Sequence, residues 1–495
     1  MKYLPDGQSM KAADKDTIEN LNIPSLDLME RAAERVVRVI RDERIDLSEI
    51  LVICGSGNNG GDGFAIARMF KDAGCHVTVF MAGNPAHCSS ECQYQKMLYE
   101  SKGGTVVYEY PDGTYSVIVD AIFGVGLSRE VEGTYRDVIE RMNTSVGTKV
   151  AVDIPSGIDS GNGCVLGVAF KADITVTFQA QKLGLFLYPG KEYAGRVFIE
   201  DIGISLRTMD ENENVACALD DREYAALLPK RPADSNKGSF GKLLVIAGSE
   251  GMSGAAFLNA AAAYRVGAGL VKIYTEESNR IILQTLLPEA IIDTYIDFEK
   301  EKVKALLEWA DAVCIGSGIG MHTTSKKILK TVLKNVKVPC LVDADGLNLI
   351  AKHLEYTECF SEGIFVLTPH MKEMSRLSGL EIAEIKRNRN HVLSSLSQEW
   401  NVTCVLKDSR TMIASQGERT VVNTSGCQAL AKGGSGDVLS GVIAGLMAQG
   451  LSVYDATVLG VYLHGRSGEI AAKEQNMYSV LARDLLNALA KIKLA

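Results

Sequence analysis

Short apolar runs rich in β-branched residues recur along the chain, and each is followed by glycine or aspartate and then by helical spacing of apolar residues. In the first half the runs occupy residues 51–54, 117–119, 150–152 and 174–178. In the second half they occupy residues 243–247, 312–315, 340–342, 365–367 and 402–406. Such continuous runs are typical of strands buried on both faces, and their alternation with helices predicts parallel sheets built from β-α-β units. The sequence therefore predicts an α/β fold.

The length and one polar segment divide the chain in two. A chain of 495 residues is too long for a single hydrophobic core. Residues 207–214 are polar and acidic and show no periodicity, so a domain boundary is expected within residues 207–222. Each half is long enough to bury a core of its own. We predict one domain over residues 1–217 and a second over residues 222–492.

Composition and charge disfavour several classes of protein. With 46% hydrophobic and 23% charged residues the chain has the composition of a soluble globular protein, and it contains no apolar run long enough for a membrane span. The net charge of −9 disfavours nucleic acid or an anionic membrane as the partner. Eleven cysteines without a disulfide framework indicate reduced thiols, and the N-terminus lacks the apolar segment of a signal peptide. We expect a cytoplasmic protein that binds neither nucleic acid nor membranes.

The segment Gly433-Gly434-Ser435-Gly436-Asp437 stands directly before an apolar run with helical spacing. Glycines let successive N–H groups point into one concavity, and the start of a helix adds the positive end of its dipole, so this turn predicts an anion site. A carboxylate repels a bound phosphate. Asp437 is therefore expected to hold a cation or to accept a proton from a hydroxyl beside a transferring phosphoryl group. From the spacing alone, a packing turn with a helix-capping aspartate stays open.

Polar clusters follow five strands expected in the second half, where the ligand of an open α/β sheet lies. They comprise residues 248–255, 316–320, 343–348, 368–370 with Glu373, and 407–411. We predict that they converge on one edge of the sheet as an active site. His370 is expected to contact the ligand, although a structural histidine is the alternative. Lys407 and Thr411 would hold nucleotide phosphates unless they lie in a solvated loop, and Asp345 and Glu373 would bind Mg²⁺ through water.

Together these motifs resemble the ribokinase-like superfamily and, within it, the ADP/ATP-dependent NAD(P)H-hydrate dehydratases. The matching stretches are residues 236–242, 248–249, 253–256, 316–318, 343–345, 368–370 with Glu373, and 433–437. The resemblance implies a C-terminal ribokinase-like αβα domain in which the hydrated nicotinamide nucleotide contacts Ala255, Gly318, His370 and Asp437. It also implies that ADP or ATP, with Mg²⁺, binds Lys407, Asp408, Ser409, Arg410, Thr411 and Gly436. The family usually has glycine where this chain has Asp408.

In the first half the run at 51–54 leads into Gly55-Ser56-Gly57-Asn58-Asn59-Gly60-Gly61-Asp62-Gly63. The glycine spacing fits a dinucleotide-binding turn, but the next strand, at 76–81, does not end in the acidic residue that such cofactors require. The asparagines and Asp62 indicate polar contacts to a nucleotide ligand instead. Residues 120–126 and 153–159 add further oxygens at strand ends, which suit a hard cation. Turns and caps that merely close the loops are the alternative.

These segments resemble the NAD(P)H-hydrate epimerase domain over residues 1–217, with Asn-Asn-Gly-Gly-Asp at 58–62 and Asp-Ile-Pro-Ser-Gly at 153–157. The resemblance implies a Rossmann-like αβα domain that binds the hydrate through Asn58, Asn59, Gly60, Gly61, Asp62, Gly124, Val125, Gly126, Leu127, Ser128, Arg129, Glu130 and Asp153. It implies a K⁺ site at Asn59, Asp120 and Ser156. Asp153 would be the acid/base that interconverts the R and S hydrates. Lys182 is a second candidate unless it is a solvated surface lysine.

Both resemblances imply the same substrates, NADH hydrate and NADPH hydrate. We therefore expect an enzyme, both isomerase and lyase, that epimerises the hydrates and dehydrates the S form at the expense of ADP or ATP. One alternative is a kinase of a vitamin alcohol fused to a regulatory nucleotide-binding domain, because the glycine turn suits either reaction. Another makes the first half a non-catalytic nucleotide sensor. The resemblance also implies a homo-oligomer.

Overall fold

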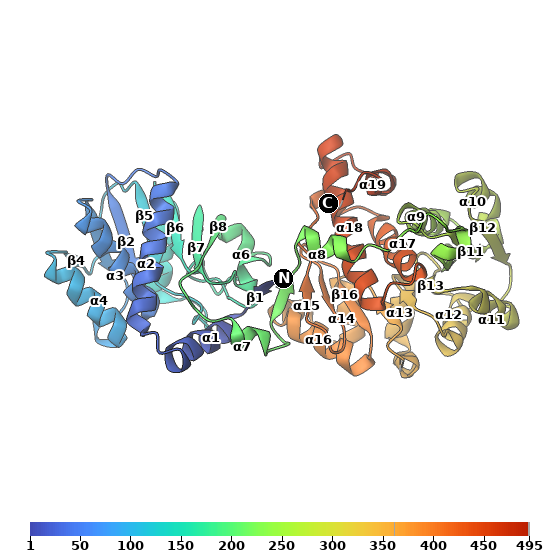
Figure 1. Cartoon of the computed structure of the whole chain (residues 1–495), viewed down its shortest axis with the longest axis horizontal. Coiled ribbons are helices and arrows are strands. Elements are labelled where there is room, and N and C mark those ends of the chain that lie inside the picture. Colours follow the sequence, from blue (N-terminus) through green and yellow to red (C-terminus); the bar gives the residue numbers. More distant parts are fainter. Residues whose placement is uncertain (361, 494–495) are drawn as a thin grey trace. The chain divides into compact units, whose positions relative to one another are not determined.

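The computed structural model describes residues 1–360 and 362–493, and the chain divides between residues 216 and 217 into two compact units. Each unit is built around a mostly parallel sheet covered by helices (Figure 1). The α/β fold predicted from the apolar runs is confirmed, and each run overlaps a strand, although Ala247 and Val402 lie one residue outside β10 and β16. Among the described residues, no helix is both long and apolar enough to cross a membrane.

The sheet of the first unit is parallel throughout, with strand order β4-β3-β2-β5-β6-β7-β8. Its strands are β2 (Ile50–Cys54), β3 (Val77–Met81), β4 (Val106–Val107), β5 (Val117–Ala121), β6 (Thr148–Val152), β7 (Ile174–Phe178) and β8 (Arg196–Glu200). The chain builds the sheet outward from β2 in one direction and from β5 in the other. In such sheets the ligand crevice lies at this reversal, beyond the carboxyl ends of the strands.

Helices cover both faces of this sheet because successive residues of each strand point in opposite directions. In β2, Val52 joins a core formed with α2 (Ser25–Asp42), α3 (Asn58–Asp72) and α4 (Ser90–Ser101), whereas Ile53 joins one formed with α5 (Gly133–Thr144). The remaining elements up to residue 210 are β1 (Lys2–Leu4), α1 (Gly7–Asn20), η1 (Pro85–His87), η2 (Leu183–Leu185), α6 (Gly190–Tyr193) and α7 (Arg207–Asp210). This two-faced burial explains why the strands read as uninterrupted apolar runs.

The sheet of the second unit includes, in order, β9-β18-β17-β16-β15-β14-β13-β10-β11-β12. Its parallel strands are β10 (Lys242–Ile246), β11 (Leu270–Glu276), β12 (Ile291–Tyr295), β13 (Ala312–Ile315), β14 (Cys340–Val342), β15 (Phe365–Leu367) and β16 (Thr403–Leu406). Antiparallel β17 (Met412–Ala414) and β18 (Val421–Val422) extend it, and β9 (Ala216–Ala218) pairs with β18. The carboxyl ends of β10 and of β13 to β16 therefore share one edge.

Helices also lie on both sides of this sheet. Figure 1 shows α9 (Ser253–Arg265), α17 (Ser435–Ala448) and α18 (Val453–Glu474) on one side and α11 (Lys300–Trp309) and α12 (Thr323–Asn335) on the other. Helix α17 packs against both α9 and α18 and is buried along almost its whole length. This burial is expected for a helix that is apolar all round.

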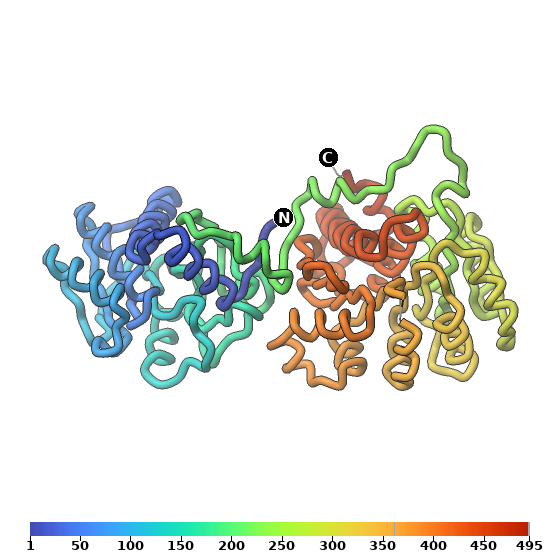
Figure 2. The backbone as a smooth tube through the Cα atoms, turned by 60° about the horizontal axis from the view of Figure 1, so that its bottom comes forward, coloured from blue at the N-terminus to red at the C-terminus, as the bar shows by residue number. Residues whose placement is uncertain are grey.

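The remaining elements of the second unit are short or peripheral. They are α8 (Asp221–Ala226), η3 (Lys237–Phe240), η4 (Glu277–Asn279), α10 (Arg280–Leu286), α13 (Asp345–Lys352), η5 (Leu354–Cys359), α14 (Met371–Ser378), α15 (Ile382–Arg387), α16 (Arg389–Trp400), η6 (Gln428–Leu430) and α19 (Ala482–Leu489). In Figure 2 the backbone after α8 runs as an extended connection, drawn in green, before β10 begins. Thus α8 and β10 belong to one unit although only the short helix η3 lies between them in the sequence.

Candidate active sites

A cavity of about 680 Å³ lies in the first unit at the predicted crevice. Its wall includes Asn58, Asn59 and Asp62 after β2, residues 124–129 after β5, and Asp153 after β6. Helices α1 and α2 close it with residues such as Asp14 and Met29. Ten of the thirteen residues expected to bind the hydrate therefore face one cavity, as the strand order requires.

The other three expected residues do not line this cavity. A Cβ atom at Gly60 would lie 1.9 Å from the carbonyl oxygen of Gly55, and one at Gly61 would lie 2.7 Å from Cε of Met29. These two glycines let the start of α3 approach the preceding loop and α2 closely. Glu130 is exposed outside the cavity. The packing of Gly60 and Gly61 thus accounts for their place in the motif without ligand contact.

Lys182 is buried, with 1% of its surface exposed, so its interpretation as a solvated surface lysine is wrong. Its ammonium donates hydrogen bonds to Oδ1 of Asp153, to Oγ1 of Thr177 at 2.9 Å and to the carbonyl of Phe178 at 3.0 Å. An ammonium has three N–H donors, and these three acceptors engage them all. Lys182 therefore fixes and neutralises the Asp153 carboxylate.

The backbone of Asp153 also sets the direction of its side chain. Its φ of +66° lies in the left-handed region, which costs a non-glycine residue about 1–3 kcal/mol. The conformation is held by a hydrogen bond of 2.8 Å from the Asp153 amide to the carbonyl of Val176. Oδ1 accepts from Lys182 and Thr177, whereas Oδ2 has no hydrogen-bond partner among the described residues. The free oxygen belongs to a residue that lines the cavity.

Replacing Lys182 with methionine is expected to destabilise the first unit by about 3–5 kcal/mol, because it leaves the Asp153 carboxylate buried without its partner. Both tryptophans, Trp309 and Trp400, lie in the second unit. In urea titrations far-UV circular dichroism should therefore show an earlier transition, while tryptophan fluorescence keeps its midpoint. The control is Lys171→Met, an exposed lysine of the same unit, which should change neither. Equal circular-dichroism midpoints for the two variants would contradict the role of Lys182.

Of the three residues expected at K⁺, Asp120 and Ser156 are hydrogen-bonded to each other, and Asn59 lines the cavity. Asp120 is fully buried and accepts hydrogen bonds from the amides of Ile122 at 3.2 Å and Ser156 at 2.7 Å and from the Ser156 hydroxyl at 2.6 Å. Burial raises the pKa of Asp120 to about 6, against the opposing effect of these hydrogen bonds, and no positive side chain contributes. A bound cation would supply the missing charge, and oxygen ligands of this kind suit K⁺.

In the second unit the carboxylate of Asp343, which is buried, joins three strand ends to the glycine turn. Its Oδ1 accepts hydrogen bonds from Oγ1 of Thr368 at 2.7 Å and Nζ of Lys407 at 2.8 Å. Its Oδ2 accepts from Oγ of Ser440 in α17 at 2.8 Å. The convergence predicted for the polar clusters after β14, β15 and β16 is confirmed. Lys407 is thus held by an ion pair and not in a solvated loop.

The glycine turn presents Asp437 and Gly436 to this cluster. Gly434 has a φ of +88°, which favours glycine, and α17 begins at the next residue. A Cβ atom at Gly436 would lie 3.6 Å from Nζ of Lys407. Burial, and next the charge of Asp343, raise the pKa of Asp437 to about 6. A carboxylate with this pKa is suited to accept a proton near neutral pH.

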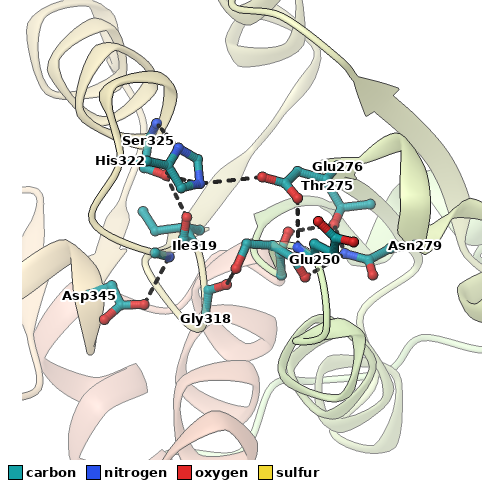
Figure 3. A network of polar contacts seen from close by, with 12 residues as sticks. Glu250, Thr275, Glu276, Asn279, Gly318, Ile319, His322, Ser325 and Asp345 are labelled. Carbon is teal, nitrogen blue, oxygen red and sulfur yellow. Dashed lines mark hydrogen bonds and ion pairs between the residues drawn. The ribbon is translucent and has the colours of Figure 1, made fainter.

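Two loops of the second unit, after β10 and β13, are tied together by polar contacts (Figure 3). Oγ of Ser249 donates to the carbonyl of Gly318 at 2.9 Å, and the amide of Gly320 donates to Oδ2 of Asp345 at 2.9 Å. Gly318 has a φ of +63°, and a Cβ atom there would lie 3.1 Å from Cβ of Ala255. Gly318 and Ala255, both expected at the hydrate, therefore lie side by side.

Comparisons with known proteins cover both units. Residues 243–491 match a family described as NAD(P)H-hydrate dehydratase, and residues 25–184 match one described as the YjeF-related protein N-terminus. The chain is 34% identical to the bifunctional NAD(P)H-hydrate repair enzyme of Moorella thermoacetica, over 98% of this chain and 96% of that one. The chain belongs to the family of bifunctional NAD(P)H-hydrate repair enzymes. The Escherichia coli member is 33% identical over 98% of this chain and 92% of its own length.

In this member of the repair-enzyme family His370 caps a helix. Its Nδ1 accepts hydrogen bonds from the amides of Lys372 at 3.1 Å and Glu373 at 3.2 Å at the start of α14. Burial lowers the pKa of His370, which keeps the ring neutral and able to accept. His370 therefore has a structural role, and its expected contact with the ligand, which stays a prediction, would use Nε2. Asp345, the first residue of α13, has one carboxylate oxygen, Oδ1, without a hydrogen-bond partner among the described residues.

The carboxylates expected at Mg²⁺ differ in their availability. Glu373 accepts a hydrogen bond from the amide of His370 at 2.9 Å through Oε2, and its Oε1 lies 3.3 Å from Nε2 of His370. Asp345 keeps one oxygen free. Among the described residues, no group of three or more His, Cys, Asp and Glu side chains is arranged to hold a metal. The residues therefore fit an ion held by one carboxylate together with nucleotide phosphates, which is the usual coordination of Mg²⁺.

The loop after β16 uses two of its polar residues for internal contacts. Asp408 lies 3.6 Å from Arg389 in an ion pair, and Nη1 of Arg410 donates to the carbonyl of Thr424 at 2.9 Å. Sequence reasoning missed His322 and Glu276, whose side chains lie 3.3 Å apart and connect the loops of Figure 3. His322 is the N-cap of α12, and its place directly before a helix is the sequence signal that could have identified this residue.

Proposed function

We propose that this protein repairs hydrated nicotinamide cofactors, interconverting the R and S hydrates of NADH and NADPH in the first unit and dehydrating the S form in the second. The dehydration would consume ADP or ATP and release AMP or ADP with phosphate. Family membership over 98% of the chain carries the proposal, because it spans both units and both sites. A vitamin-alcohol kinase with a regulatory domain would account for the glycine turn but not for the Asp153 site.

The second unit supplies a base and an anion cradle for the dehydration. Hydration leaves a hydroxyl on the nicotinamide ring, and hydroxide is a poor leaving group. Asp437 would take the proton of this hydroxyl while the hydroxyl oxygen accepts a phosphoryl group. The amides at Gly436 and the Lys407 ammonium would stabilise the charge of the phosphoryl group. The phosphate of the resulting ester then leaves with the electron pair of the C–O bond, and loss of a proton from the neighbouring ring carbon restores the double bond of the dihydronicotinamide. Ala255 and Gly318 would form the adjoining wall for the ring.

The nucleotide site would comprise Lys407, Asp408, Ser409, Arg410, Thr411 and Gly436, with Mg²⁺ held by nucleotide phosphates and Asp345. The closeness of Lys407 to Gly436 supports this assignment. Mg²⁺ would supply charge neutralisation between the phosphates. In the first unit the hydrate would occupy the cavity, with Asp153 as acid/base and with K⁺ at Asn59, Asp120 and Ser156. The chain is further proposed to act in the cytoplasm as a homo-oligomer, which size-exclusion chromatography with light scattering would test.

The proposal is tested by incubating the full-length protein with mixed NADH-hydrate epimers, Mg²⁺ and either ADP or ATP. Return of the dihydronicotinamide absorbance from both epimers is the expected result. A phosphorylated hydrate that accumulates without this absorbance would favour the kinase alternative. No reaction with either nucleotide would end the repair proposal. Parallel reactions with NADPH hydrate and with each nucleotide separately would establish the preferences.

Replacing K⁺ with tetramethylammonium is expected to slow epimerisation severalfold, because the buried Asp120 carboxylate loses its counter-charge. The measurement is the interconversion rate of separated epimers without nucleotide, before and after K⁺ is returned. The matched control is Asp120→Asn, which removes the charge and should make the remaining rate insensitive to the cation. An unchanged wild-type rate without K⁺ would contradict the cation site.

A further inference from the structure

We propose that Asp62 is a second catalytic residue of the first unit, a proton donor that works across the cavity from Asp153. The inference rests on the proposed epimerisation and deepens it. It assigns the two carboxyl groups opposite tasks, so that the substrate hydroxyl leaves from one face of the ring and water enters from the other.

The two carboxyl groups reach the cavity from the connections that follow different strands. Asp62 lies in the first turns of α3, which follows β2, and Asp153 follows β6. Strand β5 lies between β2 and β6, so the two strand ends are separated by two strand spacings, about 10 Å. The cavity of about 680 Å³ that both residues face leaves room for a planar ring. Both residues line the same cavity.

The two carboxyl groups have different partners. Asp153 accepts a hydrogen bond from the ammonium of Lys182. Asp62 has no hydrogen-bond or ion-pair partner among the described residues, and burial, followed by the charges of Asp153 and Asp14, raises its pKa well above the usual range. Asp62 also acts on the buried thiol of Cys54, because burial and, to a smaller extent, the charge of Asp62 raise the pKa of this thiol. Two carboxyl groups in such different environments can serve as one acid and one base in the same site.

Asp14 is the other carboxyl group of the cavity wall, and it is less suited to donate. Burial and the charge of Asp153 raise its pKa, but the positive charge of Lys182 acts in the opposite direction. Lys182 is not among the charges that act on Asp62. Lys11 also lines this wall. Asp62 therefore holds its proton more firmly than Asp14 does.

A buried polar atom in the same wall points to a ligand. Asn59 is 9% exposed and lines the cavity, and its Nδ2 has no hydrogen-bond partner among the described residues. A buried N–H donor without an acceptor costs about 1–3 kcal/mol. A polar group of the substrate would satisfy it. Asn59 precedes Asp62 by almost one helical turn, so the same ligand would reach both.

The reaction follows from the substrate's chemistry. An enamine adds water at the carbon next to nitrogen, so the hydroxyl-bearing carbon is bonded to the ring nitrogen. Asp62 gives its proton to the hydroxyl, the C–O bond breaks with its electron pair on the leaving water, and the nitrogen lone pair forms a C=N bond. Water then adds from the other face, the C=N pair returns to nitrogen, and Asp153 takes the water's proton. The hydroxyl configuration is inverted, and the reverse reaction exchanges the two roles.

The test measures interconversion of separated NADH-hydrate epimers by the full-length protein without nucleotide. Asp62→Asn is expected to lower kcat by about 100-fold or more with KM within about threefold, as for loss of a general acid. The wild-type rate should fall at high pH as Asp62 loses its proton, and this alkaline limb should be absent from Asp62→Asn. In ¹⁸O-labelled water each inversion should incorporate one solvent oxygen. Asp62→Glu restores a proton donor, and its kcat should be at least tenfold higher than that of Asp62→Asn.

The matched comparison is Asp14→Asn, which removes the other carboxyl group of the wall and should cost much less than Asp62→Asn. A larger loss with Asp14→Asn, a raised KM with unchanged kcat in Asp62→Asn, or inversion without solvent oxygen would each overturn the assignment. Dehydration of the S hydrate and the circular-dichroism melt report whether Asp62→Asn is folded, and Asp62→Glu decides the question if it is not. If the wild type fails to epimerise, the proposed function fails; if only the variant effect is absent, this inference alone fails.

Discussion

Replacing Asp437 with alanine is expected to lower the rate of nucleotide-dependent dehydration by about 10³-fold or more while epimerisation continues unchanged. Asp437 is the carboxylate beside the anion turn, and its pKa of about 6 lets it accept a proton at neutral pH. Without it, the substrate hydroxyl keeps its proton as the phosphoryl group arrives. The measurement is the recovery of dihydronicotinamide absorbance from S hydrate, followed at several pH values.

The direction in which the dehydration rate changes with pH can also be predicted. A base acts in its deprotonated form, so the wild-type rate should fall as the pH drops through about 6 and level off above it. The matched control is Asp455→Ala, which removes a carboxylate from the same position of the neighbouring helix α18, in its first turn and away from the cluster. This control should keep the wild-type rate and profile. Dehydration that survives Asp437→Ala would show that another group is the base.

Replacing Asp153 with asparagine is expected to stop enzymatic epimerisation, a loss of about 10²–10⁴-fold. Asparagine is chosen because the φ of +66° at this position is tolerated better by asparagine than by alanine. When a mixture of epimers is incubated with ADP or ATP and Mg²⁺, only the S hydrate should then be converted rapidly to the dihydronicotinamide. The R hydrate should follow at the spontaneous rate.

The measurement is chromatography of both epimers during the reaction. The control is Asp137→Asn, an exposed carboxylate on α5 of the same unit, which should leave both phases unchanged. Because Lys182 would remain buried without its charged partner, the variant should also be less stable, and its folding is checked by circular dichroism. Full consumption of the R hydrate at the wild-type rate would refute the role of Asp153.

Much of the fold could be predicted from local pattern. A strand buried on both faces is built mostly from apolar and β-branched residues, so runs such as 174–178 and 312–315 identify β7 and β13 residue by residue. Glycine turns before helices likewise signal where the chain can approach an anion. The nature of Lys182 could not be predicted in this way, because a single lysine after a strand has the same sequence whether it is solvated or buried.

The structure also decided what His370, Glu373, Gly60 and Gly61 contact. His370 and Glu373 engage one another at the start of α14, which the sequence could have indicated as a capping pair but which competed with the expected ligand roles. Gly60 and Gly61 serve close packing, Gly60 against the loop just before α3 and Gly61 against Met29 of α2. In each case the sequence allowed either a ligand or another part of the protein as the contact, and the packing decided between them.

By itself the sequence determined the α/β class, the strands and the two sets of motifs that carry the family resemblance, because these depend on spacing over a few residues. Only the tertiary structure decided the electrostatics of the sites. Asp343 meets Thr368, Lys407 and Ser440 across 25, 64 and 97 residues of chain, and Lys182 meets Asp153 across 29. Burial and charge at these contacts set which carboxyl group holds a proton, and such properties arise only when distant segments pack together.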